Sequence, residues 1–245
     1  MKGIPELFND IIRKHLNVHA AWLPVTNTIQ LGDFGIVSNG VFVPQGNIQT
    51  EFGVPFNVRS GPASKIDFSS QGAAITKLIG GAQVNVIPPG TVNASISIEF
   101  QNEKSFIVKS PSIEVTAISN VAAVGKALSK VSGWRAKYKV VHQTYKALDA
   151  IVISTIDKKT IIAFTGDATA LGQLQLGNAG LSYSSNKALG LEVQGKSGVL
   201  GIGLFKINSG FLGNNQVSVM RGAPKAVSKT SIQVEFLQGP LKNDW

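Results

Sequence analysis

The spacing of apolar residues predicts a helix at the start of the chain. Apolar positions over residues 4–16 recur three and four apart, as on one face of an amphipathic helix. Glu6 lies in the first turn, where a negative charge is favoured. The cations Arg13 and Lys14, with the neighbouring His15, lie in the last turn, where positive charge is favoured. We expect this helix to pack on the core, and the alternative is a basic end that contacts acidic lipid headgroups.

From residue 22 onward, the pattern is that of many short strands. Residues 29–37 and 41–48 flank Asn39-Gly40, a pair that supplies the positive φ angles of a two-residue hairpin turn. Pro44 places the second of these strands at a sheet edge, because proline has no backbone donor.

The clearest alternation in the chain lies in residues 92–100. Apolar residues occupy every second position from Val92 to Phe100, and the residues between them are polar, as in a strand with one buried face. Asn120 is expected to cap a helix. We predict further strands at 65–79, 105–109, 138–145, 148–156, 160–164 and 230–237, a strand or a lead into the next element at 113–118, a loop at 52–63, a helix at 120–132, and a short helix or crossover at 168–176.

A glycine- and serine-rich stretch closes the β-rich part of the chain. We interpret it as two strands, 181–193 and 199–207, joined by a turn at Gly195–Gly198. Glycine weakens a strand interior unless a bulge, a bend or a closely approaching backbone needs it, so Gly201 and Gly203 indicate one of these features. The first strand is the better candidate to move, and the second is the better candidate for stable core.

Together, these elements predict an α+β fold. It is β-rich, with a twisted and mostly antiparallel sheet and a few flanking helices, including the amphipathic N-terminal helix. Residues 1–207 are predicted to form a single main domain. The composition changes after Ile207, so residues 208–245 are predicted to form a C-terminal tail that is either inhibitory or a closing edge strand.

The charge of the chain narrows the class of partner. The 245 residues include 23 Lys and Arg against 14 Asp and Glu, a net charge of +9. Such a charge predicts attraction to an anionic partner, either a phospholipid surface or nucleic acid. Aromatic residues make up 7% of the chain and lie mostly in apolar stretches, which argues against nucleic acid. For most individual lysines, ordinary solubility charge is the simpler interpretation.

The sequence contains no recognisable catalytic motif, so we expect no enzyme, no catalytic residue and no cofactor. The absence of cysteine excludes disulfides, thiolate nucleophiles and thiolate metal sites. His15 and His19 are four apart without an accompanying glutamate, so no metal site is expected. His142 lies in a predicted strand, where we expect a structural histidine.

The order of these elements resembles the N-terminal, pore-forming domain of gasdermins, in particular the compact bacterial members. The likeness covers most of residues 4–207 and rests on pattern and spacing, with no invariant motif. The chain lacks the lipidated N-terminal cysteine of bacterial members, which argues against lipid-assisted insertion. In chain order, the likeness runs through the first helix, Leu23-Pro24-Val25 and the hairpin, Val92–Phe100, Val115–Leu128, Tyr138–Ile153, and the strands 181–193 and 199–207.

The resemblance implies a cytoplasmic, autoinhibited protein that moves to an anionic phospholipid membrane on activation and assembles there with other copies of itself into a pore. Two regions, within 65–110 and 140–195, would refold into membrane-spanning hairpins. Arg13 and Lys14 would be the lipid contacts, together with lysines near turns.

The tail then has one of two roles. As an inhibitory segment, it would hold the body until an activating protease cuts in the region marked by Met220, Arg221 and Lys225. In the alternative interpretation the chain is a non-enzymatic, β-rich binding or structural module with an anionic partner, and the tail strand is a permanent part of its sheet.

Overall fold

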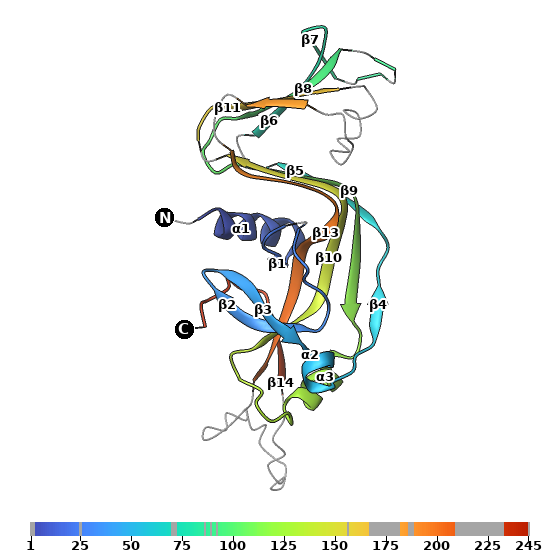
Figure 1. Cartoon of the computed structure of the whole chain (residues 1–245), viewed down its shortest axis with the longest axis vertical. Coiled ribbons are helices and arrows are strands. Elements are labelled where there is room, and N and C mark those ends of the chain that lie inside the picture. The colour runs from blue at the N-terminus through green and yellow to red at the C-terminus, as the bar shows by residue number, and fades with distance from the viewer. Residues whose placement is uncertain are drawn as a thin grey trace, which may run out of the picture.

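The computed structural model describes residues 3–24, 26–69, 73–85, 87–88, 90–91, 93–155, 157–166, 182–185, 189–208 and 233–244. These residues form an elongated molecule of two antiparallel sheets and three helices (Figure 1). The α+β, β-rich fold class predicted from the sequence is therefore confirmed.

The larger sheet is built around three long strands, β9 (Phe106–Ile118), β10 (Lys139–Thr155) and β13 (Leu189–Asn208). β10 is central, with β9 along one side and β13 along the other. Two short strands, β1 (His19–Ala20) and β14 (Gln233–Leu237), both pair with β13. The last predicted strand of the chain is thus present, and it closes an edge of this sheet.

A hairpin, β2 (Asp33–Ser38) and β3 (Val41–Asn47), adds to the lower end of β10. Asn39 and Gly40 have φ angles of 49° and 73°, as the predicted turn requires. β3 ends the strand order, so Pro44 lies on an edge strand as predicted. Across the sheet, β4 (Val58–Ser60) and β5 (Ser64–Ser69) pair with β9. The loop predicted at 52–63 therefore contains one short strand.

The smaller sheet lies above the upper ends of the long strands (Figure 1). Its buried face packs against Ile107, Ile151 and Ile153 of β9 and β10. Its strands, in spatial order, are β12 (Ser182–Ser185), β11 (Thr160–Gly166), β8 (Ala94–Phe100), β6 (Ala73–Ile79) and β7 (Ala82–Val84).

The helices cover the larger sheet. α1 (Ile4–Leu16) matches the predicted helix, and its side chains Phe8 and Ile12 are fully buried against the sheet. α2 (Ile48–Phe52) and α3 (Val121–Leu128) lie near the lower end (Figure 1). Asn120 precedes α3 but makes no side-chain cap, because its Oδ1 accepts a hydrogen bond from the amide of Asn57 (2.8 Å).

The turn predicted at Gly195–Gly198 is wrong, because β13 runs unbroken through it. Gly195 and Gly198 pair with alanines of β10, which supplies backbone hydrogen-bond partners along its whole length. Ser182–Ser185, expected to run into this turn, pairs instead with β11 in the smaller sheet. The strands predicted at 138–145 and 148–156 are likewise one strand, β10.

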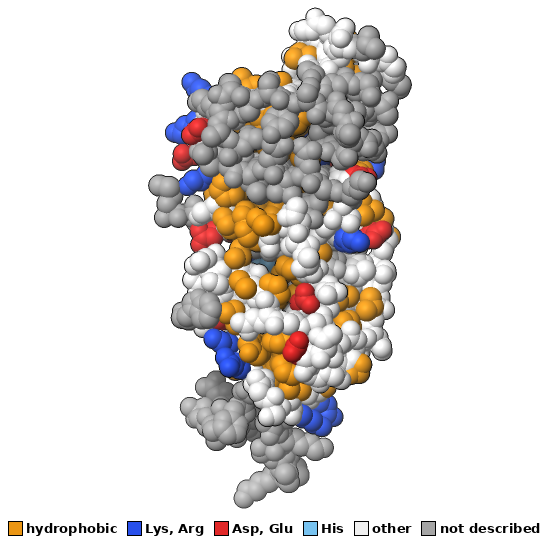
Figure 2. Space-filling view, in the orientation of Figure 1, with side chains coloured by type: hydrophobic (Ala, Val, Ile, Leu, Met, Phe, Trp, Pro, Cys, Tyr) orange, Lys and Arg blue, Asp and Glu red, His pale blue; other side chains and the backbone are white. Residues whose placement is uncertain are grey.

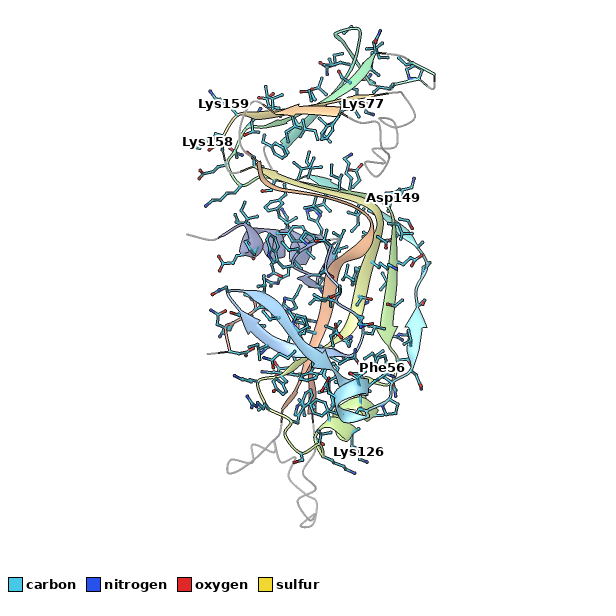
Figure 3. The ribbon with its side chains drawn as sticks, in the orientation of Figure 1. Phe56, Lys77, Lys126, Asp149, Lys158 and Lys159 are labelled. Carbon is cyan, nitrogen blue, oxygen red and sulfur yellow. The ribbon has the colours of Figure 1, made fainter. Side chains whose placement is uncertain are left out.

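β9 is also continuous, although it contains Pro111. The pairing between β9 and β10 skips at this level, where Asp149 of β10 has a φ of 46°. Because proline has no N–H, an interruption of the ladder at Pro111 leaves no donor of this residue without a partner. Ser110 bridges the gap, donating through its hydroxyl to the carbonyl of Leu148 (2.6 Å). Figure 3 shows Asp149 where the long strands bend toward the smaller sheet.

Candidate functional site

The basic end of α1 is positioned by the buried face of the helix. Phe8 packs against Phe106 of β9, with ring centroids 5.7 Å apart. Asn9 is buried, and its Oδ1 accepts the backbone N–H of Ala20 in β1 (2.9 Å). These contacts fix how α1 is rotated on the sheet, and so fix where the side chains of its last turn lie.

Arg13 and Lys14, the predicted lipid contacts, occupy different environments. The Nη2 atom of Arg13 donates to the carbonyl oxygen of Gln238 (3.1 Å), and its Nη1 lies 4.0 Å from Asp10 Oδ1. Lys14 is exposed. The C-terminal part of the chain therefore occupies one of the two predicted contacts, and the other is open to solvent.

Residues 233–244, here called the C-terminal segment, comprise β14 and the residues that follow it, and they lie on the larger sheet. Leu237 and Leu241 are partly buried and pack against a cluster that includes Ala21, Val141 and Ile202. Packing of these leucines removes apolar surface from water, worth about 25 cal/mol per Å². The segment is thus attached to β1, β10 and β13 by side chains as well as by strand pairing.

An ion pair anchors the far end of the C-terminal segment. Lys139 Nζ donates to Asp244 Oδ2 (2.6 Å), and the two side chains are only 9% and 12% exposed. The same carboxylate accepts the backbone N–H of Val37 (2.6 Å), and the N–H of Asp244 donates back to the Val37 carbonyl (3.1 Å). Asn243 accepts the N–H of Gly40 through its Oδ1 (3.2 Å). The end of the segment is therefore joined to the β2–β3 hairpin.

Two histidines contact β14 from the body. His19 is 1% exposed, and its Nε2 lies 3.0 Å from the carbonyl oxygen of Leu237. Burial lowers the pKa of His19 to about 4; the bond to Leu237 opposes this shift, and the charge of Arg13 adds to it. Burial also lowers the pKa of His142 to about 4, with a contribution from the charge of Arg59.

The ring of His142 meets that of Phe236 at a centroid distance of 4.8 Å. This packing fits the structural role expected of His142. Sequence reasoning linked neither His142 nor His19 to the C-terminal segment. Lys139 and Asp244 were also missed, since they lie 105 residues apart and only the fold brings them together.

The two regions expected to refold meet in the smaller sheet. β6, β7 and β8 come from 65–110, and β11 and β12 come from 140–195. β8 and β11 pair along their whole lengths and join the two regions. In β8 the residues Ala94, Ile96 and Ile98 are at most 2% exposed, and the polar residues between them are less buried, as the alternation predicted.

The remaining predictions concern the cleavage region, metal binding, membrane-spanning helices and enzyme activity. Met220, Arg221 and Lys225 fall outside the described residues. Within the described ranges, no three His, Asp or Glu side chains are grouped to hold a metal ion, and no helix is long and apolar enough to cross a membrane. That the protein is not an enzyme stays a prediction.

The basic side chains of the described residues are not gathered into one patch on the face that Figure 2 shows. On the face shown in Figure 2, the Lys and Arg side chains of the described residues lie toward the margins, and apolar and uncharged side chains occupy much of the middle. Figure 3 places Lys158 and Lys159 together at one side of the smaller sheet, far from Lys126 at the opposite end.

Comparison with known proteins gives a structural likeness but no sequence match. No protein-family profile matches the chain, and no curated protein matches its sequence. Among solved structures, the chain is similar to the gasdermin A3 membrane pore determined by cryo-EM, with 10% identity and a TM-score of 0.37 over 90% of this chain and 97% of that one. That structure belongs to the family that the order of sequence elements resembles, and a likeness at this level assigns neither a family nor a function to this chain.

Proposed function

We propose that this chain is a membrane-binding, pore-forming protein that its C-terminal segment keeps autoinhibited. The observation that carries the proposal is the hydrogen bond from Arg13 to the carbonyl of Gln238. This guanidinium is one of two cations at the end of an amphipathic helix, where an acidic headgroup would bind. While the segment is attached, Arg13 is engaged within the protein and is only 23% exposed.

The smaller sheet supports the same proposal. The amphipathic strands β8 and β11 have seven residues each, and a membrane-spanning strand needs ~9–11 residues. Lengthening each strand by a few residues at its ends would make it long enough. In the membrane form, these strands exchange their contacts with Ile107 and Ile151 for contacts with lipid.

The proposed partners follow from this arrangement. They are an anionic phospholipid membrane, other copies of the chain that assemble on it, and a protease that cuts between the body and the C-terminal segment. The protein carries out no catalytic step and uses no cofactor. The cytoplasm is its place before activation.

Dye release from lipid vesicles tests the proposal. A recognition sequence for a specific protease is inserted between Met220 and Lys225, and the intact and cut proteins are added to vesicles with and without anionic lipid. At pH 7.5, we expect release only from anionic vesicles and only after the cut. Lys14→Gln in the cut protein should weaken binding to these vesicles, because it removes a cation that is exposed at the end of α1. Intact vesicles in every arm would contradict the proposal.

A β-rich module with a permanent tail strand is the second candidate function. The observation that favours it is the pairing of β14 with β13 over five residues, an ordinary closing edge strand. In that case the cut protein keeps its C-terminal segment and binds anionic vesicles without releasing dye.

A further inference from the structure

β14 contacts two histidines that come from different strands of the body. His19 of β1 meets the Leu237 carbonyl through Nε2 at 3.0 Å, and the ring of His142 in β10 meets that of Phe236 at 4.8 Å. The two contacts lie at neighbouring positions of one short strand. A change in the charge of either imidazole therefore acts directly on the attachment of β14.

The partner of His19 determines its neutral form. A carbonyl oxygen can only accept, so Nε2 carries the hydrogen, and Nδ1 is left as a buried atom with no partner. Protonation would add an N–H at Nδ1, in a residue that is 1% exposed. A buried donor without an acceptor is unfavourable, and more so when it carries charge.

His142 is the bulge residue of β10. The register passes from Val141 directly to Gln143, so His142 has no partner on β13. Its ring occupies the space over Gly203, where an added Cβ would lie 2.8 Å from Nε2. The half-buried imidazole thus lies between Gly203 and Phe236, and an imidazolium there would lose part of its hydration.

The charges that face the two imidazoles disfavour protonation. Arg13 of α1 acts on His19. Arg59 of β4 acts on His142. Among the other charged groups on β10, β13 and the C-terminal segment, Lys139 pairs with Asp244 and Lys206 pairs with Glu235.

We propose that His19 and His142 form a pH-sensitive latch, in which neutral imidazoles keep β14 on β13 and mild acid releases the C-terminal segment. Release exposes both rings to water, where a histidine titrates near its ordinary pKa of about 6.5. Release of the segment would also free the protein to insert in a membrane, and this further step rests on the proposed function. The attachment of β14 and its dependence on pH do not.

The direction follows from the pKa values. Because the pKa of each attached histidine is about 4, below the ordinary value of 6.5, attachment is fully favoured above pH 6.5 and weakens as the pH falls toward 4. At pH 5.5, each histidine weakens the attachment by about tenfold, and the two together by about a hundredfold. This pH lies above the ordinary titration range of carboxylic acids.

Hydrogen exchange of the full chain tests the latch without a membrane. Exchange is measured at pH 7.5 and 5.5 and corrected for the intrinsic pH dependence of amide exchange, with β8 as the internal reference. We expect protection in 233–237 to fall by about a hundredfold while that of β8 stays constant. Equal protection at both pH values, or an equal loss in β8, would overturn the proposal. Vesicles that stay intact at pH 5.5 would count only against the proposed function.

Substitutions identify the groups responsible. His19→Gln keeps an N–H donor for the Leu237 carbonyl but does not titrate, and His142→Phe keeps a ring against Phe236. Each should reduce the loss of protection to about tenfold, and both together should remove it. His15→Gln, at an exposed position of α1, should leave the response unchanged. A full response in the double variant overturns the proposal. If the double variant does not fold, the test rests on the wild-type protein and either single variant, whose losses of protection should be about a hundredfold and about tenfold.

Discussion

At the scale of single residues, the C-terminal segment depends most on Asp244. Its carboxylate neutralises Lys139, whose side chain is only 9% exposed, and also accepts the N–H of Val37. Removing one partner of a nearly buried pair leaves the other charge uncompensated, which is far more unfavourable than the loss of a surface pair.

We therefore expect Asp244→Asn to lower the free energy of unfolding by about 2–3 kcal/mol, measured by urea denaturation. The matched control is Asp67→Asn. Asp67 pairs with Lys109 at 3.0 Å but is 70% exposed, so its loss should cost below about 1 kcal/mol. Similar small effects of the two substitutions would show that the end of the C-terminal segment is not firmly attached.

The structure explains why residue 203 is a glycine, which the sequence only suggested. Glycine in the middle of a strand indicated a bulge, a bend or a close approach, and the bulge at His142 lies beside it. A methyl group at Gly203 would lie 2.8 Å from His142 Nε2 and 2.9 Å from Gln143 Cβ.

Gly203→Ala should thus destabilise the protein by about 1–3 kcal/mol through overpacking. Gly61→Ala serves as the control, because its nearest neighbour would be 3.8 Å away. The midpoint of thermal unfolding compares the two variants. If they unfold at the same temperature, the close approach at Gly203 has no energetic consequence.

At the scale of elements, sequence patterns correctly predicted the features that depend on residues close to one another in the chain. The helix at 4–16, the Asn39-Gly40 turn and the alternating strand β8 each follow from residues close in sequence. The errors occur where a distant partner decides. Gly195–Gly198 has the composition of a turn, yet pairing with β10 keeps it extended. The elements predicted at 105–109 and 113–118 are one strand, β9, in which a skip in the ladder accommodates Pro111.

The candidate site was predictable only in part, for the same reason. A basic end of α1 can be seen in the sequence, but its contact with Gln238 joins residues 225 apart. Likewise, Lys139 and Asp244 carry no sequence signal that would pair them. Contacts of this range follow from topology, which a single sequence does not contain.

α1 should be essential to the body as well as to the site. Phe8 is fully buried among Phe106, Trp22 and the sheet, so Phe8→Ala should cost about 3–5 kcal/mol of unfolding free energy in urea. Ile11→Ala, on a partly buried face of the same helix, should cost clearly less. Equal costs would mean that the helix packs less specifically than its buried face indicates.

At the scale of the whole molecule, the proposed function links the two ends of the structure. The C-terminal segment is attached to the lower body, and the strands proposed to insert lie in the smaller sheet above it (Figure 1). α1 and the long strands β9, β10 and β13 lie between these two ends. The long strands pack against the smaller sheet, and the last turn of α1 contacts the C-terminal segment. In the proposed function, release of the segment frees Arg13 at the end of α1, and the amphipathic strands then meet the membrane.

The most direct test of this account controls the attachment of β14 in a single sample. The chain has no cysteine, and Lys206 and Glu235 are directly opposite in the β13–β14 ladder. Opposed Cα atoms in such a ladder are about 4.5–5.5 Å apart, within the range of a disulfide. Lys206→Cys with Glu235→Cys should therefore lock β14 on β13 under oxidising conditions.

The decisive measurement is dye release from anionic vesicles by this locked variant after a protease cut between Met220 and Lys225. The account predicts intact vesicles while the disulfide holds and dye release once a reductant is added. The cut variant with Lys206→Cys alone should release dye with or without reductant. Release from the oxidised, locked protein, or none after reduction, would contradict the claim that the C-terminal segment restrains a pore-forming body.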